Sequence, residues 1–142
     1  MAAFEKRAWL KLFSMGPAYA VYFAIQRLHP EWLATMLDRI SVLAAVACVH
    51  AAIYVIGLLA IKAGERGEPL VADERDHAID GRSSRAAYYL MIFGVILVGM
   101  VLPFDKSGWE IVNSALAVIV AAETLRSLLT IAGYRRRRRL AR

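Results

Sequence analysis

Four long apolar runs, separated by short polar stretches, dominate the pattern of hydrophobic and polar positions along the chain. The runs cover about 9–28, 40–61, 86–103 and 111–132. Apolar residues follow one another within each run, and about 20 such residues cross the ~30 Å hydrocarbon core of a bilayer as a helix. The pattern predicts a single all-α domain, a polytopic membrane protein built as a bundle of four transmembrane helices.

Composition agrees with lipid as the main solvent, because 59% of the 142 residues are hydrophobic. The lone cysteine, Cys48, lies inside an apolar run, which excludes an internal disulfide framework. The start of the chain imitates a secretory signal, yet Lys11 interrupts its apolar part and the run continues well beyond Pro17. We therefore expect an uncleaved first span, with a kink or a close helix contact at Gly16 and Pro17.

Lysine and arginine are distributed unequally between the ends of the predicted spans. Three lie before or at the start of the first run, five in the loop between the second and third runs, and six in the C-terminal tail. The other two loops hold only three. Because basic loops stay on the cytoplasmic side, we expect both termini and the middle loop in the cytoplasm.

The tail contains five consecutive arginines, namely Arg135, Arg136, Arg137, Arg138 and Arg139. We expect these side chains to bind the anionic headgroups of the bilayer, which attract basic residues next to a span. Phosphates of a nucleic acid are a less favoured partner, because no aromatic residues are interleaved with the arginines. A protein partner for the tail is the remaining interpretation.

The middle loop carries a dense polar segment, 71–89, immediately before the third run. Asp73 suits the N-cap of a helix, which we expect over about 73–85, continuing into the third span with a weak point at Gly81. Its predicted partner-binding face comprises Asp73, Glu74, Arg75, Asp76, Ile79 and Asp80. Ile79 is the one large apolar side chain among these charges, an anchor for another protein or for the protein's own helices.

The acidic residues of this segment admit a second interpretation. Asp73 and His77, like Asp76 and Asp80, are four residues apart, a spacing that could ligate a divalent cation. The same side chains also make an ordinary solvated face that pairs with nearby arginines. We assign neither a metal nor a cofactor to the segment.

Three polar side chains lie within the predicted spans: His50 in the second, and Glu123 and Arg126 in the fourth. Counted from the tryptophan before each span, the three lie within about one helical turn in depth. Small residues would let the two spans approach: Ala44, Cys48, Ala52, Ala117 and Ala121. The cluster is either a structural Glu123–Arg126 salt bridge, with Arg126 reaching toward the headgroups, or a site for a proton, ion or ligand.

A weak internal repeat would divide the bundle into two hairpins in parallel repeat. It aligns Arg7, Ala8, Gly16, Trp32, Ile56 and Gly57 with Arg85, Ala86, Gly94, Trp109, Ala132 and Gly133. Chance matching between apolar segments produces alignments of the same quality.

The loop motif also resembles a known group of proteins. Asp73, Glu74, Arg75 and Asp76 are followed by Ile79, and then by Ser84, Arg85, Ala87 and Tyr88 leading into a span. This is similar to a poorly characterised family of small bacterial four-helix inner-membrane proteins with an Asp-Glu-Arg-x-x-x-Ile loop before the third helix. Members often occur beside small helix-turn-helix regulators. The resemblance implies a four-span protein of the bacterial inner membrane with a role in regulation.

The chain carries none of the common enzyme motifs, such as a P-loop, a nucleophile elbow, a dinucleotide-binding glycine motif or a zinc-protease signature. The sequence therefore predicts a non-enzymatic membrane regulatory or interaction protein. Its cytoplasmic helix would bind a protein partner, and its small-residue faces would form a homodimer. The alternative is a small transporter or channel subunit that uses His50, Glu123 and Arg126.

Overall fold

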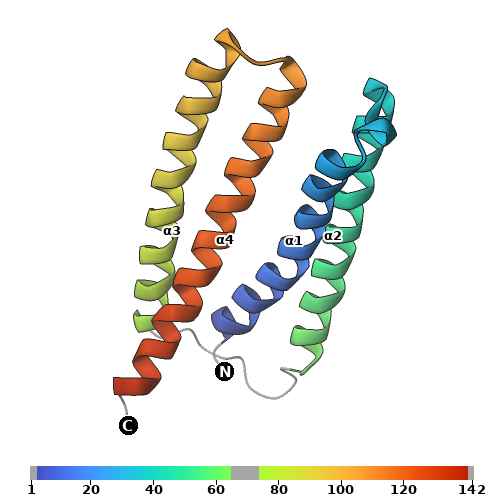
Figure 1. Ribbon diagram of the computed structural model, residues 1–142. Coiled ribbons are helices and arrows are strands. Elements are labelled where there is room, and N and C mark those ends of the chain that lie inside the picture. Colours follow the sequence, from blue (N-terminus) through green and yellow to red (C-terminus); the bar gives the residue numbers. More distant parts are fainter. Residues whose placement is uncertain (1–2, 65–73, 141–142) are drawn as a thin grey trace. The chain divides into compact units, whose positions relative to one another are not determined.

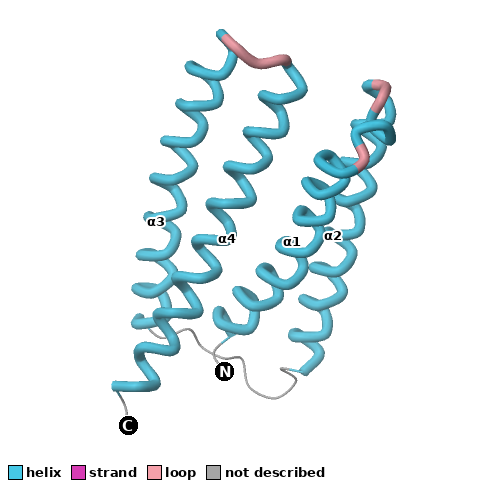
Figure 2. Tube along the Cα trace, in the orientation of Figure 1, coloured by secondary structure: helices cyan, strands magenta, loops and turns pink. Residues whose placement is uncertain are grey.

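The computed structural model describes residues 3–64 and 74–140, without the side chains of Ala3, Arg75 and residues 137–140. These parts of the chain are helices joined by short turns and contain no strand (Figure 1, Figure 2). In order they are α1 (Ala3–Leu28), the 3-10 turn η1 (Pro30–Leu33), α2 (Met36–Gly64), α3 (Glu74–Ile96), the π-helical turn η2 (Leu97–Val101), the 3-10 turn η3 (Leu102–Phe104) and α4 (Gly108–Leu140). The all-α prediction is confirmed.

Three of the four long helices are long and apolar enough to cross a membrane, at Met36–Gly64, Asp76–Phe104 and Gly108–Arg136. They contain the second, third and fourth predicted spans. The helix α1 covers the predicted first span without interruption, but it does not belong to this group. Lys11, Pro17, Tyr19 and Tyr22 make the apolar stretch of α1 less hydrophobic than the most apolar stretches of the other three helices. The chain is therefore a membrane protein by the length and composition of α2, α3 and α4.

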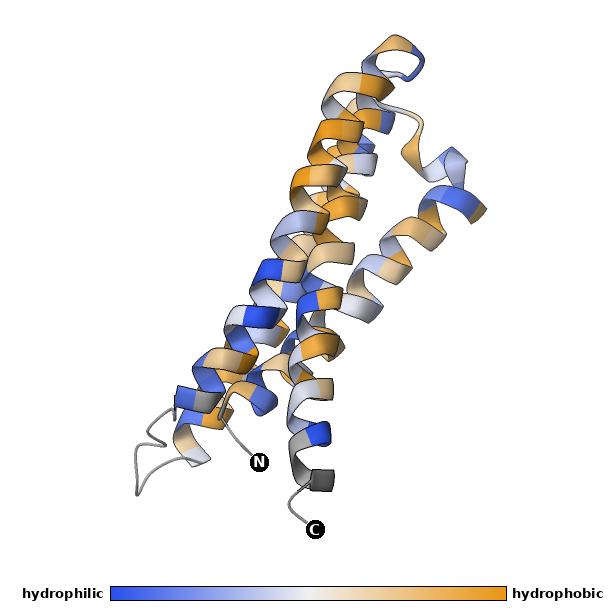
Figure 3. Ribbon diagram, turned by 90° about the vertical axis from the view of Figure 1, so that its left-hand side faces the viewer, coloured by the Kyte–Doolittle hydropathy of each residue, from blue (hydrophilic) through white to orange (hydrophobic). Residues whose placement is uncertain are grey.

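The predicted loop helix and the third span as far as Ile96 are one continuous helix, α3, and the rest of that span lies in η2 and η3. Gly81, expected to be a weak point, has helical neighbours on both sides and no positive φ angle. Figure 3 shows the change of polarity along this helix, which is hydrophilic in its first half and hydrophobic in its second. The predicted N-cap Asp73 lies outside the described residues, as does the preceding connection beyond Gly64.

An antiparallel hairpin of α3 and α4 forms one compact unit, together with the α1 residues up to Ala8 (Figure 1). A Cβ atom added at Gly94 would overlap the side chain of Val118, so the two helices are in close contact there. Other small residues are buried in the same unit, namely Ser83, Ala87, Ala122 and Ser127. Small residues suit this contact because van der Waals packing, rather than the hydrophobic effect, associates helices in lipid.

The second unit contains the rest of α1, the turn η1 and α2. Its two helices are antiparallel, and a Cβ atom added at Gly57 would overlap the side chain of Leu10. In contrast, an added Cβ at Gly16 would meet no atom of the described residues within 4 Å, so of the two alternatives expected there, a kink or a close helix contact, the close contact is not seen in this part of the chain. No residue of α2 is buried, and large apolar side chains such as Ile56 are exposed. This surface suits lipid as its solvent.

Two helices begin with reciprocal capping boxes. At α2, the backbone N–H and hydroxyl of Thr35 donate to Asp38 Oδ2 at 3.0 and 2.6 Å, and the Asp38 N–H donates back to Thr35 Oγ1 at 3.2 Å. At α4, Ser107 and Glu110 repeat this arrangement, with distances of 2.9, 2.9 and 3.4 Å. Sequence analysis missed both boxes, although a Ser or Thr followed three residues later by an acid is their usual signal.

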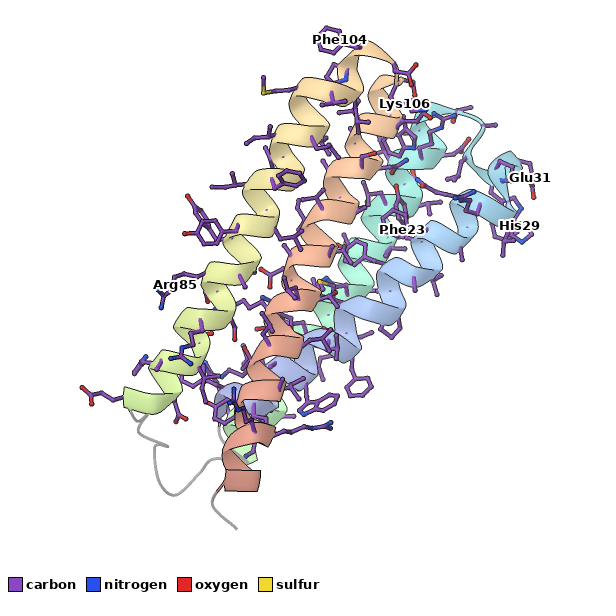
Figure 4. The ribbon with its side chains drawn as sticks, turned by 60° about the vertical axis from the view of Figure 1, so that its left-hand side comes forward. Phe23, His29, Glu31, Arg85, Phe104 and Lys106 are labelled. Carbon is purple, nitrogen blue, oxygen red and sulfur yellow. The ribbon has the colours of Figure 1, made fainter. Side chains whose placement is uncertain are left out.

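In the turn before α2, the ring of His29 stacks on Trp32 with centroids 4.4 Å apart and contacts Glu31 Oε1 through Nδ1 at 2.9 Å. The Glu31 backbone N–H and the His29 ring hold the pKa of the Glu31 carboxyl below its usual range. His29 and Glu31 both lie at the end of the α1–α2 pair in Figure 4. Glu31 is exposed, so this contact shapes the turn and contributes little to stability.

Candidate functional site

An ion pair joins the two helices of the α3–α4 hairpin. Arg126 Nη2 on α4 donates to Asp80 Oδ1 at 3.1 Å and to Oδ2 at 3.4 Å. The side chain of Arg126 is 38% exposed and that of Asp80 is 29% exposed, so solvent only partly screens the attraction between their charges. Sequence analysis placed Asp80 on a partner-binding face and Arg126 in an intramembrane cluster, and the pairing between them was missed.

Next to the ion pair, Ile79 of α3 packs against Gly133 of α4. A Cβ atom added at Gly133 would lie 2.7 Å from Ile79 Cγ2. Together with the Gly94–Val118 contact, this defines one antiparallel register along the hairpin. We call residues 74–85 of α3 and the facing residues 123–136 of α4 the polar base of the hairpin.

Two buried hydroxyl groups in the polar base, those of Ser83 and Thr130, are bonded within their own helices. Ser83 Oγ donates to the Ile79 carbonyl, and Thr130 Oγ1 donates to the Arg126 carbonyl, each at 2.9 Å. Both side chains are nearly fully buried. Because each hydroxyl has a partner four residues earlier on its helix, these polar groups can pack in the hairpin without an unsatisfied donor.

The first turns of α1 belong to the same unit as the polar base. The rings of Phe4 and His77 meet edge to face with centroids 6.0 Å apart. Glu5 and Ala8, on the same turns, are buried. Residues near the N-terminus therefore cover part of α3 close to the ion pair, which sequence analysis did not anticipate.

The predicted partner-binding face divides into an inner and an outer part. Ile79 and Asp80 contact α4, so the apolar anchor docks on the protein's own helix, one of the two options that the sequence left open. Glu74 is exposed and Asp76 half-buried, while Asp73 and the side chain of Arg75 lie outside the described part of the structure. His77 and Ala78 are also exposed, and they extend the outer face.

The three residues of the predicted intramembrane cluster belong to different units. Glu123 and Arg126 lie one turn apart on α4, and both are half-buried. His50 lies on α2, where its ring meets Tyr19 edge to face at 5.6 Å and Tyr54 at 6.4 Å. Its Nε2 atom is buried without a hydrogen-bond partner among the described residues. A joint site of all three residues stays a prediction.

The small residues expected to bring the second and fourth spans together are all exposed, namely Ala44, Cys48, Ala52, Ala117 and Ala121. The small residues that make close contacts are Gly94 and Gly133 in the α3–α4 seam and Gly57 in the α1–α2 unit.

Two groups of arginines are exposed in this unit. Arg135 and Arg136, the described side chains of the predicted headgroup-binding run, are exposed, and α4 remains helical through Leu140. Arg82 and Arg85 on α3 are exposed as well, and Figure 4 shows Arg85 pointing away from α4. Sequence analysis counted both arginines toward orientation, placed Arg85 in the loop motif and the internal repeat, and treated nearby arginines as partners of the acids.

Neither a known protein family, nor a curated protein, nor a solved structure matches this chain. In the described ranges, no three His, Cys, Asp or Glu side chains lie close enough together to hold a metal ion. The arrangement offers a helical hairpin whose charged end is joined by Asp80 and Arg126.

Proposed function

We propose that the chain is a non-enzymatic regulatory or interaction protein of a bacterial inner membrane, which its four long helices span with both termini in the cytoplasm. The exposed first turns of α3, at Glu74, His77 and Ala78, bind a cytoplasmic protein. The excess of basic residues in the tail and the middle loop supports this orientation. Exposed small residues on α2 provide a surface for a homodimer.

The observation that carries this proposal is the continuity of α3 from Glu74 to Ile96. A helix is stiff over this length, so a protein bound at the first turns acts directly on the apolar half. The contacts of Ile79 with Gly133 and of Asp80 with Arg126 then pass any tilt of α3 on to α4. Interaction at the exposed face thus becomes a rearrangement of the hairpin inside the membrane.

The test uses site-specific photo-crosslinking from position 77 in native membranes, followed by mass spectrometry of the product. The double variant Glu74→Lys and Ala78→Arg changes the charge and bulk of the exposed face without touching the contacts to α4. We expect it to abolish a crosslinked product that wild type forms. Asp105→Lys, at the opposite end of the hairpin, is the matched control and should leave the product unchanged. Identical products from all three proteins would contradict the proposal.

The alternative function, transport, is favoured by one observation, the buried Nε2 atom of His50 without a hydrogen-bond partner in the described structure. A titratable group in that position suits a proton pathway. An argument against transport is that Arg126, a member of the predicted intramembrane cluster, already forms an ion pair with Asp80. Proteoliposomes with an internal pH-sensitive dye separate the two functions. Proton flux above that of empty liposomes, lost in His50→Leu or Glu123→Gln, would establish transport and reject the interaction proposal.

A further inference from the structure

One exposed face of α3 changes from basic to aromatic to apolar along the helix. Arg82 and Arg85 come first, and the rings of Tyr88 and Tyr89 follow, meeting edge to face at 6.0 Å. The tyrosines are 60% and 68% exposed. Beyond them the exposed side chains are large and apolar, namely Ile92, Phe93, Val95 and Ile96. This is the order of chemical groups met on passing from headgroups into hydrocarbon.

The length of the helix places this transition at a membrane surface. From Arg85 to Pro103 the chain advances 18 residues, about 27 Å at ~1.5 Å per residue, close to the ~30 Å thickness of the hydrocarbon core. Phe104, 91% exposed, and Lys106 lie at the opposite end of the hairpin (Figure 4). Arg82 and Arg85 therefore lie at the level of the lipid phosphates when the hairpin spans the bilayer.

The charges around the two arginines favour an anion. No acidic residue lies three or four positions from either of them on α3. Arg85 Nε donates to the Gly81 carbonyl at 3.3 Å, which leaves the other guanidinium donors directed outward. Asp80, two residues before Arg82 on α3, is paired with Arg126, and the exposed Arg135 and Arg136 add positive charge at the same end of the hairpin.

We propose that Arg82 and Arg85, with Tyr88 and Tyr89, form a binding face for the phosphate headgroups of anionic phospholipids. The arginines take the phosphate, the tyrosines lie at the glycerol level, and the apolar residues beyond them contact the acyl chains. Continuity with the apolar surface of α3 favours a lipid over a soluble anion. The inference depends on the hairpin spanning a membrane and is independent of partner binding at Glu74 and Ala78.

The test is native mass spectrometry of the detergent-solubilised full chain, titrated separately with phosphatidylglycerol and phosphatidylcholine. We expect tighter binding of phosphatidylglycerol, and a loss of about 25-fold in Arg82→Gln with Arg85→Gln, since each basic residue near the surface contributes about fivefold. Arg27→Gln with Lys106→Gln removes the same charge at other exposed positions and should change the affinity less than twofold. Both arginines of the tested pair are exposed, so the melting temperature should stay at the wild-type value.

Three outcomes would overturn the lipid site. One is an equal loss of affinity for phosphatidylglycerol in the two double variants, which would show that net charge alone causes the effect. Another is equal affinity of wild type for the two lipids. The third is binding of glycerol phosphate, a headgroup without acyl chains, as tight as that of the whole lipid, which would identify the ligand as a soluble phosphate compound.

Discussion

Arg126 on α4 holds Asp80 on α3 through both carboxylate oxygens, across 46 positions of sequence. When the hairpin spans a bilayer, the pair lies next to Arg82, at the level of the headgroups. Both side chains are half-buried, so removing one would leave the other without its counter-charge and hydrogen bonds. The pair therefore fixes how far α3 and α4 can slide along each other.

Loss of the acid should destabilise the hairpin. Asp80→Asn leaves a half-buried guanidinium without its counter-charge, and we expect the free energy of unfolding to fall by about 1–2 kcal/mol. Thermal unfolding in a fixed detergent measures it, and Asp105→Asn is the control in the exposed turn. The exchange variant Asp80→Arg with Arg126→Asp should recover part of the loss. An exchange no more stable than Asp80→Asn alone would show that the pair contributes no coupling.

Glycines in the hairpin should respond to alanine according to their surroundings. Gly94→Ala forces Val118 to move, and we expect a destabilisation of about 1–3 kcal/mol. Gly81→Ala meets no atom within 4 Å in a helical segment, and we expect a gain of about 0.5–1 kcal/mol. Equal effects of the two substitutions, measured by the same unfolding assay, would mean that α3 and α4 do not pack in this register.

The orientation can be measured by labelling single cysteines in intact cells with a membrane-impermeant maleimide. Cys48 is first replaced by Ser, because it is exposed and free. Arg136→Cys should then be labelled only after the cells are opened, and Lys106→Cys without opening, because positive residues favour the cytoplasm. The reverse pattern would invert the topology and remove Glu74 from the cytoplasm.

The capping box at the start of α4 should stabilise that helix. Ser107→Ala removes the acceptor for the Glu110 N–H and the hydroxyl donor to its carboxylate, and we expect a cost of about 0.5–2 kcal/mol. Ser107→Asn, which keeps a capping oxygen, should cost less. If the alanine and asparagine variants unfold alike, the hydrogen bonds at Ser107 add nothing to the stability of α4.

Much of the helical layout could be predicted because each apolar run lies within one long helix or, for the third run, within α3 and the helical turns η2 and η3 that follow it. The main difference between prediction and structure is the length of the helices, because every helix continues beyond its apolar run into polar sequence. The helix α4, for example, continues through the arginine run to Leu140. The boundary before α4 could also have been read from Ser107 and Glu110. These features are local in sequence, where spacing alone carries the information.

The polar base could not be predicted in the same way. The sequence suggested a local pair of Glu123 and Arg126, because residues three apart share a helix face. The partner of Arg126 is set instead by the register of two helices, which depends on the contacts at Gly94 and Gly133. The residues that flank a glycine in the sequence do not show which side chain of another helix will pack against it.

The order of Asp80 and Arg126 along the chain also has a consequence for biosynthesis. The ribosome makes α3 first, so the carboxylate is already in place when the guanidinium reaches the insertion machinery. An arginine near the middle of an isolated span raises the insertion free energy by roughly 2.5–3.5 kcal/mol, and less toward either end. A neighbour that offers a counter-charge and a close-packed seam lowers that barrier. Integration of α4 should therefore be less efficient when α3 carries Asp80→Leu, as a glycosylation-site reporter beyond α4 would register.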